Sequence, residues 1–342
     1  MAKEASGVIG GEDAVPAAVR DHLPNRLARS FLQLRWASIL VVAVALGAYF
    51  TLANENFLTR PNLLTIAQFL AAAAIISAGE VMLMICGEID LSVGQVFALA
   101  PFVMYFTWDA GAPIAVGVVA ALAVSAVVGL VNGLVTVKLR VPSFVTTLGT
   151  LFLLNGLTLT ISRAFPVRTP EGGTRFAEVM GHNIYFELAW VLAVIVVVQL
   201  GLSYTRWGLY TFSVGGNILG ASEAGVNVHL IKISNFMLCS FVGGLAGILE
   251  AFRITSIAPL AGGTSVMFQA VAAAVIGGTA LAGGSGTIVG GLLGALVLSI
   301  LLDGFTLVGI NANTLDMILG VAILAAMVLN VFLQRARRQG LA

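Results

Sequence analysis

The sequence has few charged residues. Asp, Glu, Lys and Arg make up only 10% of its 342 residues, whereas 59% are hydrophobic. A soluble globular chain carries roughly a quarter charged residues and avoids large exposed apolar patches. This composition therefore excludes a soluble fold and makes lipid the expected solvent. The formal net charge of +1 provides no basic face for a nucleic-acid partner.

Reactive and metal-binding residues are equally scarce. The two cysteines, Cys86 and Cys239, each lie in an apolar run, which suits small packing residues rather than a disulfide framework. The three histidines are far apart in the sequence: His22, His182 and His229. Without HExxH, GxSxG or paired CxxC motifs, neither a metal site nor hydrolytic chemistry is expected.

The phosphate-binding motif GxxxxGK[ST] is also missing. The glycine-rich stretch at 277–291 has no lysine after a glycine, so it cannot cradle a nucleotide phosphate in the P-loop manner. We therefore expect a chain that is not an enzyme, that needs no cofactor and that does not hydrolyse ATP by itself.

Long hydrophobic stretches dominate what is present. A helix needs about 20 apolar residues to cross the hydrocarbon, and ten stretches qualify as predicted spans: 37–54, 63–86, 94–108, 113–136, 143–161, 187–204, 231–252, 265–281, 286–302 and 315–333. The eighth is short and flanked by glycine, which makes it a candidate re-entrant segment. The sequence thus predicts an all-α membrane protein with about ten transmembrane helices. The expected organisation is a largely disordered cytoplasmic segment at 1–35, a transmembrane domain at 36–334 and a cytoplasmic tail at 335–342.

Lys and Arg orient these spans, because they are enriched in cytoplasmic loops. With the N-terminus inside, 12 of the 17 Lys and Arg residues fall on inside segments. The other five are outside: Arg60, Arg163, Arg168, Arg175 and Arg253. This bias predicts that the N- and C-termini are both cytoplasmic. The longest outside segment is then 162–186, and the longest inside loop is 205–230.

Several predicted spans carry glycines four residues apart, which places them on one helical face. The sets are Gly129 and Gly133, Gly243 and Gly247, and Gly286, Gly290 and Gly294. Small residues at this spacing let helix backbones approach closely. The helices that they bring together belong either to one subunit or to two.

Two stretches resemble the ribose-type family of ABC transporter permeases. Residues 87–103 read GEIDLSVGQVFALAPFV, which is similar to the family signature GGIDLSVGSVLAL. Residues 214–233 resemble the family's cytoplasmic segment GGNxxAAxxxGIxV, and further similar stretches extend the resemblance over 60–333 in order. Two positions depart from the pattern: Glu88 replaces a usual glycine, and Ile218 replaces a frequent glutamate.

The resemblance implies a type II ABC importer permease, in the bacterial plasma (inner) membrane, that works as a homodimer. Its partners would be a cytoplasmic ABC ATPase subunit, a periplasmic or lipid-anchored sugar-binding protein and a second copy of the permease. The substrate would be a monosaccharide moved by alternating access. A pentose such as ribose or xylose is the first choice, while hexoses, polyols and a furanosyl signalling molecule stay open.

The inside loop 205–230 would then couple transport to the ATPase. Residues 218–229 are expected to form a short helix, preceded by a turn at 215–217, and a helix on the membrane surface can act as a lever on the attached spans. A plain connection is the alternative. The residues assigned to coupling are Gly215, Gly216, Asn217, Ala221, Glu223, Gly225 and Val226.

Polar residues inside or beside the spans suggest further roles. Asp90 and Ser92 are expected to cap the third helix, because a side-chain oxygen there accepts free backbone N–H groups; direct sugar contact is the alternative. Glu80 lies deep in the second span, where an acid is costly unless it faces water or a partner. It is either hydrogen-bonded between helices or part of a substrate pathway, to which we assign Gln68, Ser77, Glu80 and Asn155. The outside segment 162–186 is either a solvated loop or a docking surface for the binding protein.

A second class of transporter stays open at this point. A proton-coupled secondary transporter of a small polar solute would use acids as relays, and the available ones are Glu80, Asp90, Glu250, Asp303 and Asp316. Such transporters often contain internal repeats and interrupted helices. No repeat relates the two halves of this sequence, which favours the ATP-driven permease.

Overall fold

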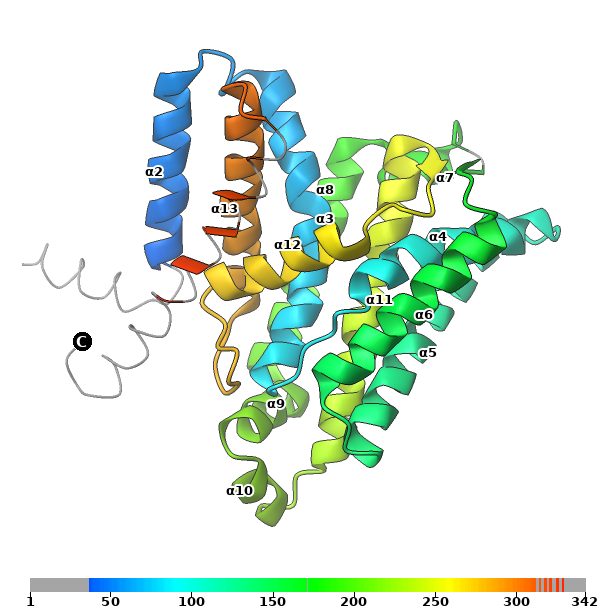
Figure 1. Cartoon of the computed structure of the whole chain (residues 1–342), viewed down its shortest axis with the longest axis vertical. Coiled ribbons are helices and arrows are strands. Elements are labelled where there is room, and N and C mark those ends of the chain that lie inside the picture. The colour runs from blue at the N-terminus through cyan, green and yellow to red at the C-terminus, as the bar shows by residue number, and fades with distance from the viewer. Residues whose placement is uncertain are drawn as a thin grey trace, which may run out of the picture.

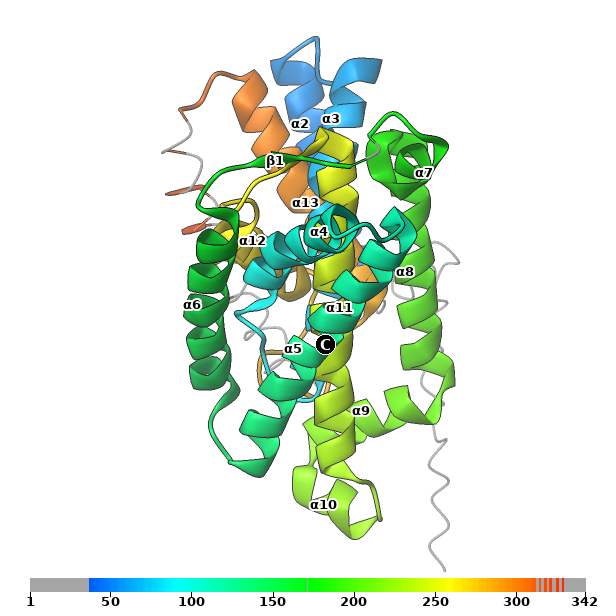
Figure 2. The same ribbon diagram turned by 90° about the vertical axis from the view of Figure 1, so that its right-hand side faces the viewer.

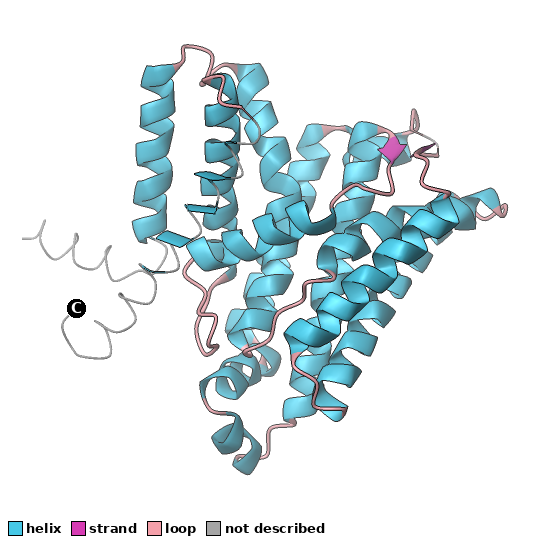
Figure 3. Ribbon diagram, in the orientation of Figure 1, coloured by secondary structure: helices cyan, strands magenta, loops and turns pink. Residues whose placement is uncertain are grey.

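The computed structural model describes residues 37–170, 172–311 and isolated positions between 314 and 328. This part of the chain is almost entirely helical (Figure 3). Its helices are α2 (Ala37–Ala53), α3 (Arg60–Ile85), α4 (Val93–Asp109), α5 (Ile114–Lys138), α6 (Ser143–Ser162), α7 (Arg175–Ala177), the π-helical turn η1 (Glu178–His182), α8 (Ile184–Tyr204), α9 (Arg206–Gly216), α10 (Ile218–Glu223), α11 (Val228–Ile254), α12 (Gly263–Ile276) and α13 (Ile288–Leu307). Two short strands, β1 (Val167–Arg168) and β2 (Ser256–Ile257), pair antiparallel.

Nine of the ten predicted spans coincide with helices. Six of these helices are long and apolar enough to cross a membrane: α3, α5, α6, α8, α11 and α13. α2 and α12 are shorter apolar helices, and α4 has 17 residues. The predicted all-α membrane class is confirmed, whereas ten crossings stay a prediction. The tenth span (315–333), the N-terminal segment (1–35) and the tail (335–342) lie largely or wholly outside the described residues.

The crossing helices differ in how deeply they are buried. In the most apolar part of α3, 78% of residues are buried, and the figure is 67% for α11 and for α13. The same fraction is only 33% in α5 and 28% in α6 and α8. α3, α11 and α13 therefore form the centre of the bundle, and α5, α6 and α8 leave most of their surface uncovered in the single chain.

The bundle has two distinct ends (Figures 1 and 2). α9 and α10 lie at one end, which we call the α10 end, together with the connection between α5 and α6. The strands, α7 and the connection between α2 and α3 lie at the opposite end, which we call the β1 end. The predicted inside loop 205–230 and outside segment 162–186 are thus at opposite ends of the molecule.

α12 is placed differently from the longer helices. It starts at about mid-height between the two ends and runs across the front of the bundle in Figure 1. The chain reaches it from β2 through residues 258–262, which form no helix. This course fits the expectation that the eighth stretch is re-entrant.

Helix starts follow local chemistry. Side-chain oxygens accept a backbone N–H in the first turn at Asn183, Thr205, Asn217, Asn227 and Thr287. This capping satisfies donors that have no partner inside the helix. Thr174 does the same for the short α7, so six helices begin where the sequence supplies Asn or Thr.

The glycines spaced four apart pack helices within one subunit. A Cβ atom added at Gly129 or Gly133 would collide with the backbone of α11, and one at Gly247 with the backbone of α4. A Cβ at Gly290 or Gly294 would collide with the end of α12. Close backbone approach inside the chain is therefore the role of these residues.

Candidate functional site

α9 and α10 form a unit that projects from the α10 end (Figure 1). In α10, Ala221 is buried, whereas Ile218 is 51% and Leu219 is 69% exposed. Glu223 is also exposed. The short helix thus packs against the rest of the chain through one buried residue, and its exposed surface is partly apolar and partly acidic.

Two details of this region differ from the sequence prediction. Gly215 and Gly216 do not form a turn: they are the last residues of α9, and Asn217 alone separates α9 from α10. The predicted helix at 218–229 ends at Glu223 instead. The reason is Gly225, whose φ of +83° terminates the turn before α11 begins.

The end of α9 is held by direct backbone contact. A Cβ added at Gly215 would collide with the carbonyl of Ile85 at the end of α3, and it would lie 2.6 Å from the amide nitrogen of Gly284. That nitrogen also donates a 2.8 Å hydrogen bond to the Ile85 carbonyl. Three segments therefore meet without intervening side chains: the ends of α3 and α9, and the loop between α12 and α13. We call this contact the glycine junction (Ile85, Gly215, Gly284).

Polar side chains reinforce the glycine junction. The Asn235 amide of α11 donates to Thr211 Oγ1 of α9 at 3.2 Å and to the Cys86 sulfur at 3.5 Å. Lys232 Nζ of α11 forms a salt bridge with Glu88 Oε1, at 2.5 Å. Glu88, which departs from the family pattern, thus ties the connection after α3 to α11.

A second polar cluster surrounds Asp90. Asp90 Oδ1 accepts from the backbone nitrogen and hydroxyl of Ser92, at 2.8 and 2.6 Å, and Oδ2 accepts from Ser240 at 3.2 Å. Asn132 Nδ2 donates to Ser92 Oγ at 2.9 Å, and Thr150 donates to Asn132 Oδ1 at 2.7 Å. This Asp90 cluster joins α4, α5, α6 and α11.

The capping prediction fits Asp90, whose Oδ1 accepts the backbone N–H of Ser92 at the start of α4, but it does not fit the Ser92 side chain. Ser92 occupies the N-cap position of α4, but its side chain makes no cap hydrogen bond. The hydroxyl is already engaged by Asp90 and Asn132. The sequence offered one signal of this cluster that we did not use, since Asn132 is an amide inside an otherwise apolar span.

The predicted pathway residues are not brought together. Ser77 and Glu80 are 0% exposed. Glu80 of α3 faces α11, where Cys239 donates its S–H to Glu80 Oε1 at 3.5 Å. Ser77 donates to the carbonyl of Ala74 in its own helix. Gln68 and Asn155 are half-buried on α3 and α6. α6 packs on α4 and α5 rather than on α3.

At the β1 end, the predicted outside segment 162–186 is folded rather than a free loop. β1 pairs with β2, and the Thr169 hydroxyl donates to the carbonyl of Ala251 at 2.6 Å. Arg253 forms a salt bridge with Glu250 at 2.5 Å and another with Glu187 at 3.7 Å. Of the charged residues expected in this segment, Glu171 lies outside the described residues.

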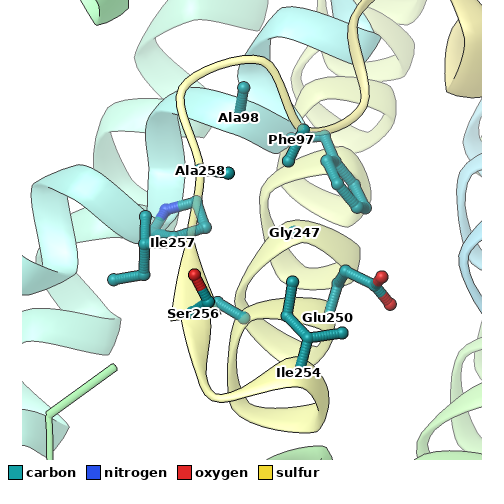
Figure 4. Close-up of a pocket in the computed structure, with 11 residues that line it drawn as sticks. Phe97, Ala98, Gly247, Glu250, Ile254, Ser256, Ile257 and Ala258 are labelled. Carbon is teal, nitrogen blue, oxygen red and sulfur yellow. The ribbon is translucent and has the colours of Figure 1, made fainter. Parts of the chain in front are cut away.

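A small pocket lies beside these charges (Figure 4). Its cavity volume is only about 10 Å³, and it is lined mainly by apolar residues of α4, α11, β2 and the segment after β2. Pockets for small ligands are usually about 300–1,000 Å³ with a few convergent polar groups. Glu250 is already paired with Arg253, so this pocket does not suit a whole sugar.

Most of the acids named for a proton relay are engaged by partners of their own. Asp303 Oδ2 accepts from Asn62 at 2.7 Å, Glu250 pairs with Arg253, and Asp90 belongs to its own cluster. Asp316 lies outside the described residues. Across the described part of the chain, no three His, Cys, Asp or Glu residues are grouped so that they could hold a metal ion.

Comparison with known proteins assigns the chain to a family. A family model described as the permease component of branched-chain amino acid transport systems matches residues 62–327. A xylose/arabinose import permease protein of Sulfolobus acidocaldarius is 40% identical over 308 residues, which cover 87% of this chain and 85% of the relative. The ribose import permease protein of Escherichia coli K12 is 35% identical over 301 residues (85% and 92%), and a fructose import permease protein of Rhizobium meliloti is 29% identical over 307 residues (87% and 85%).

No solved structure matches the chain. The family match nevertheless covers most of the sequence, and relatives more than 30% identical extend over nearly all of it. The predicted resemblance is confirmed: the chain is a multi-pass membrane protein and belongs to the ABC transporter permease family that this model describes.

Proposed function

We propose that the chain is the membrane-spanning permease subunit of an ATP-driven importer of a monosaccharide, most simply a pentose. The observation that carries this proposal is the similarity, over 87% of the chain, to a permease named for xylose and arabinose import. The similarity to a permease named for import of ribose, which is also a pentose, supports the same substrate class. Because this sequence lacks the phosphate-binding motif GxxxxGK[ST], a separate ATPase subunit hydrolyses the ATP.

The orientation proposed for this importer puts the α10 end in the cytoplasm of a bacterial cell. The excess of Lys and Arg on the segments assigned to that side supports it. Ten crossings, with both termini on the cytoplasmic side, complete the proposed topology. Single cysteines replacing Arg140 and Arg168 should react with an impermeant thiol reagent from opposite sides of the membrane.

α10 is the proposed contact for the ATPase. Its exposed Ile218 and Leu219 offer an apolar patch, and such patches on a protein that faces water mark interaction sites. Movement of α10 reaches the bundle through α9, whose last turn touches α3 and the α12–α13 loop at the glycine junction. Because this contact is made of backbone atoms, a shift of α9 displaces the other two segments directly.

The remaining partners follow from the same assembly. A sugar-binding protein would dock at the β1 end, where the strand pair and the hydrogen bond from Thr169 to the carbonyl of Ala251 hold the predicted outside segment against α11. A second permease copy would complete the translocation path. Gln68, Ser77, Glu80 and Asn155 stay as the proposed pathway residues, of which Gln68 and Asn155 are partly exposed in the single chain.

Reconstitution tests the proposal. The permease is co-expressed with the ATPase and binding protein encoded beside it, and uptake of labelled D-xylose, D-ribose and D-fructose into vesicles is measured with and without ATP inside. We expect ATP-dependent uptake of a pentose that persists with a protonophore present. Uptake that needs no ATP and collapses with the protonophore would assign the chain to proton-coupled transport.

A further inference from the structure

The first two turns of α12 carry a polar surface that no other part of the described chain covers. Thr264 and Ser265 are exposed, and Phe268 is 58% exposed. The half-buried Gln269 donates from Nε2 to Ser265 Oγ at 3.3 Å. Two hydroxyls, an amide and a phenyl ring therefore share one uncovered face.

The depth of this face argues against contact with lipid. α12 starts at about mid-height between the two ends of the bundle (Figures 1 and 2). Polar side chains at membrane depth face the protein interior or a water-filled cavity, because hydrocarbon offers them no hydrogen-bond partner. The uncovered residues of α8 differ in this respect, since Leu192, Val196 and Val197 are all apolar.

The start of α12 has unused hydrogen-bonding capacity. Its N-cap is Gly262, which has no side chain to accept the free N–H groups of the first turn. The first turn of α4 lies against it, so closely that a Cβ at Gly94 would collide with the carbonyl of Gly263. The starts of two helices therefore meet inside the bundle.

A buried amide is aimed at this meeting point. Gln95 of α4 is only 6% exposed, and its Nε2 lies 3.6 Å from the position that a Cβ of Gly263 would occupy. Its Oε1 has no hydrogen-bond partner. A buried amide oxygen left unpaired costs free energy, which points to a polar ligand that is present during part of the transport cycle.

Building on the proposed import of a monosaccharide, we propose that the first two turns of α12, together with Gln95, form a sugar-binding subsite of the transport path. A sugar carries hydroxyl groups that both donate and accept, so it pairs with the Ser265 hydroxyl and the amides of Gln95 and Gln269. The N–H groups at the start of α12 donate to sugar oxygens, as helix starts do at midplane sites of other transporters. The ring of Phe268 supplies the apolar surface that small-molecule sites also contain.

Cysteine labelling tests the subsite in the assembled importer. The two native cysteines are 0% exposed, so the natural chain serves as background for S265C and for the control V197C, a position 67% exposed on α8. A hydrophilic thiol reagent should modify S265C at least tenfold faster than V197C. The pentose that the wild-type complex transports should slow this reaction at least threefold. Adding Gln269→Leu should raise the sugar concentration that gives half-protection about tenfold, as expected for one lost hydrogen bond.

Any of three other outcomes would refute the proposed subsite. An S265C that reacts as slowly as V197C would mean that the face is covered or faces lipid. Reaction without protection by sugar would mean water access without binding. A disulfide between S265C residues of two permease copies, formed equally with and without sugar, would assign the face to the subunit contact. Failure of the proposed function is read separately, from absent sugar uptake by the wild-type complex.

Discussion

Replacing Gly215 by alanine should separate ATP hydrolysis from transport in the assembled importer. The added methyl group would collide with the Ile85 carbonyl and lie 2.6 Å from the nitrogen of Gly284. Gly216, the next residue of the same helix, has nothing within 4 Å of its Cβ position. Gly216→Ala is therefore a matched control, with the same chemical change one residue away.

The size of the effect follows from what the methyl group displaces. Ordinary contacts of a Cβ are at 3.4–4 Å, so the three backbones must separate, and the 2.8 Å hydrogen bond from Gly284 to Ile85 is lost. Overpacking costs about 1–3 kcal/mol, and the hydrogen bond contributes about 1 kcal/mol. The closed glycine junction should thus be weakened by about 2–4 kcal/mol, or at least tenfold in population.

The assay compares two rates in the same vesicles. For Gly215→Ala we expect sugar uptake to fall tenfold or more, while the complex still assembles and still hydrolyses ATP. Gly216→Ala should keep both rates near those of the wild type. Equal uptake by the two variants, in complexes of equal ATPase content, would refute transmission through the junction. If Gly215→Ala prevents assembly, Ser285→Cys with a bulky thiol label can perturb the same loop after the complex has formed.

Three further substitutions probe the polar contacts. Lys232→Met should lower the melting temperature in detergent, because it leaves Glu88 without its partner at a cost of about 1–3 kcal/mol. Adding Glu88→Gly should restore most of the lost stability. If stability does not recover, the lost salt bridge is not the cause. Asn132→Leu should destabilise the chain by about 2–4 kcal/mol, since it removes the hydrogen bonds that Asn132 makes with Ser92 and Thr150. Ser299→Ala is the control and should destabilise the chain less, because the Ser299 hydroxyl bonds only within its own helix. Glu80→Gln should leave uptake near the wild-type rate, because the amide fits the same buried contact with Cys239; a large loss at normal expression would mean that the carboxylate itself acts in transport.

Hydropathy was sufficient to predict where most of the helices lie. Runs of apolar residues indicate burial in lipid or protein. The predicted range 231–252 falls within α11, and 113–136 begins one residue before α5. The same signal cannot give depth or direction, because it is a local average along the chain. For 265–281, hydropathy alone gave one more span, and only the short length and the flanking glycines suggested the re-entrant course that fits a helix beginning at mid-height.

The polar contacts were less predictable because their partners are distant in sequence. Asp90 was expected to serve the adjacent helix, but its oxygens are taken by Ser240, 150 residues away, as well as by Ser92. Gly215 was assigned to coupling on resemblance alone, and its close backbone contact could be found only from the positions of Ile85 and Gly284. The sequence shows that a residue lacks a side chain and does not show which backbone fills the space.

The strand pair at the β1 end has a consequence for how the chain is made. β1 precedes α8, and β2 follows α11, so the pairing of Val167 with Ile257 closes a segment that runs down the bundle and back. During synthesis this pairing cannot form until α8 and α11 have both entered the membrane and their ends have returned to the same side. The short β-ladder can therefore form only after α8 and α11 have been inserted, and it fastens together chain segments that insertion has already brought to the same end of the bundle.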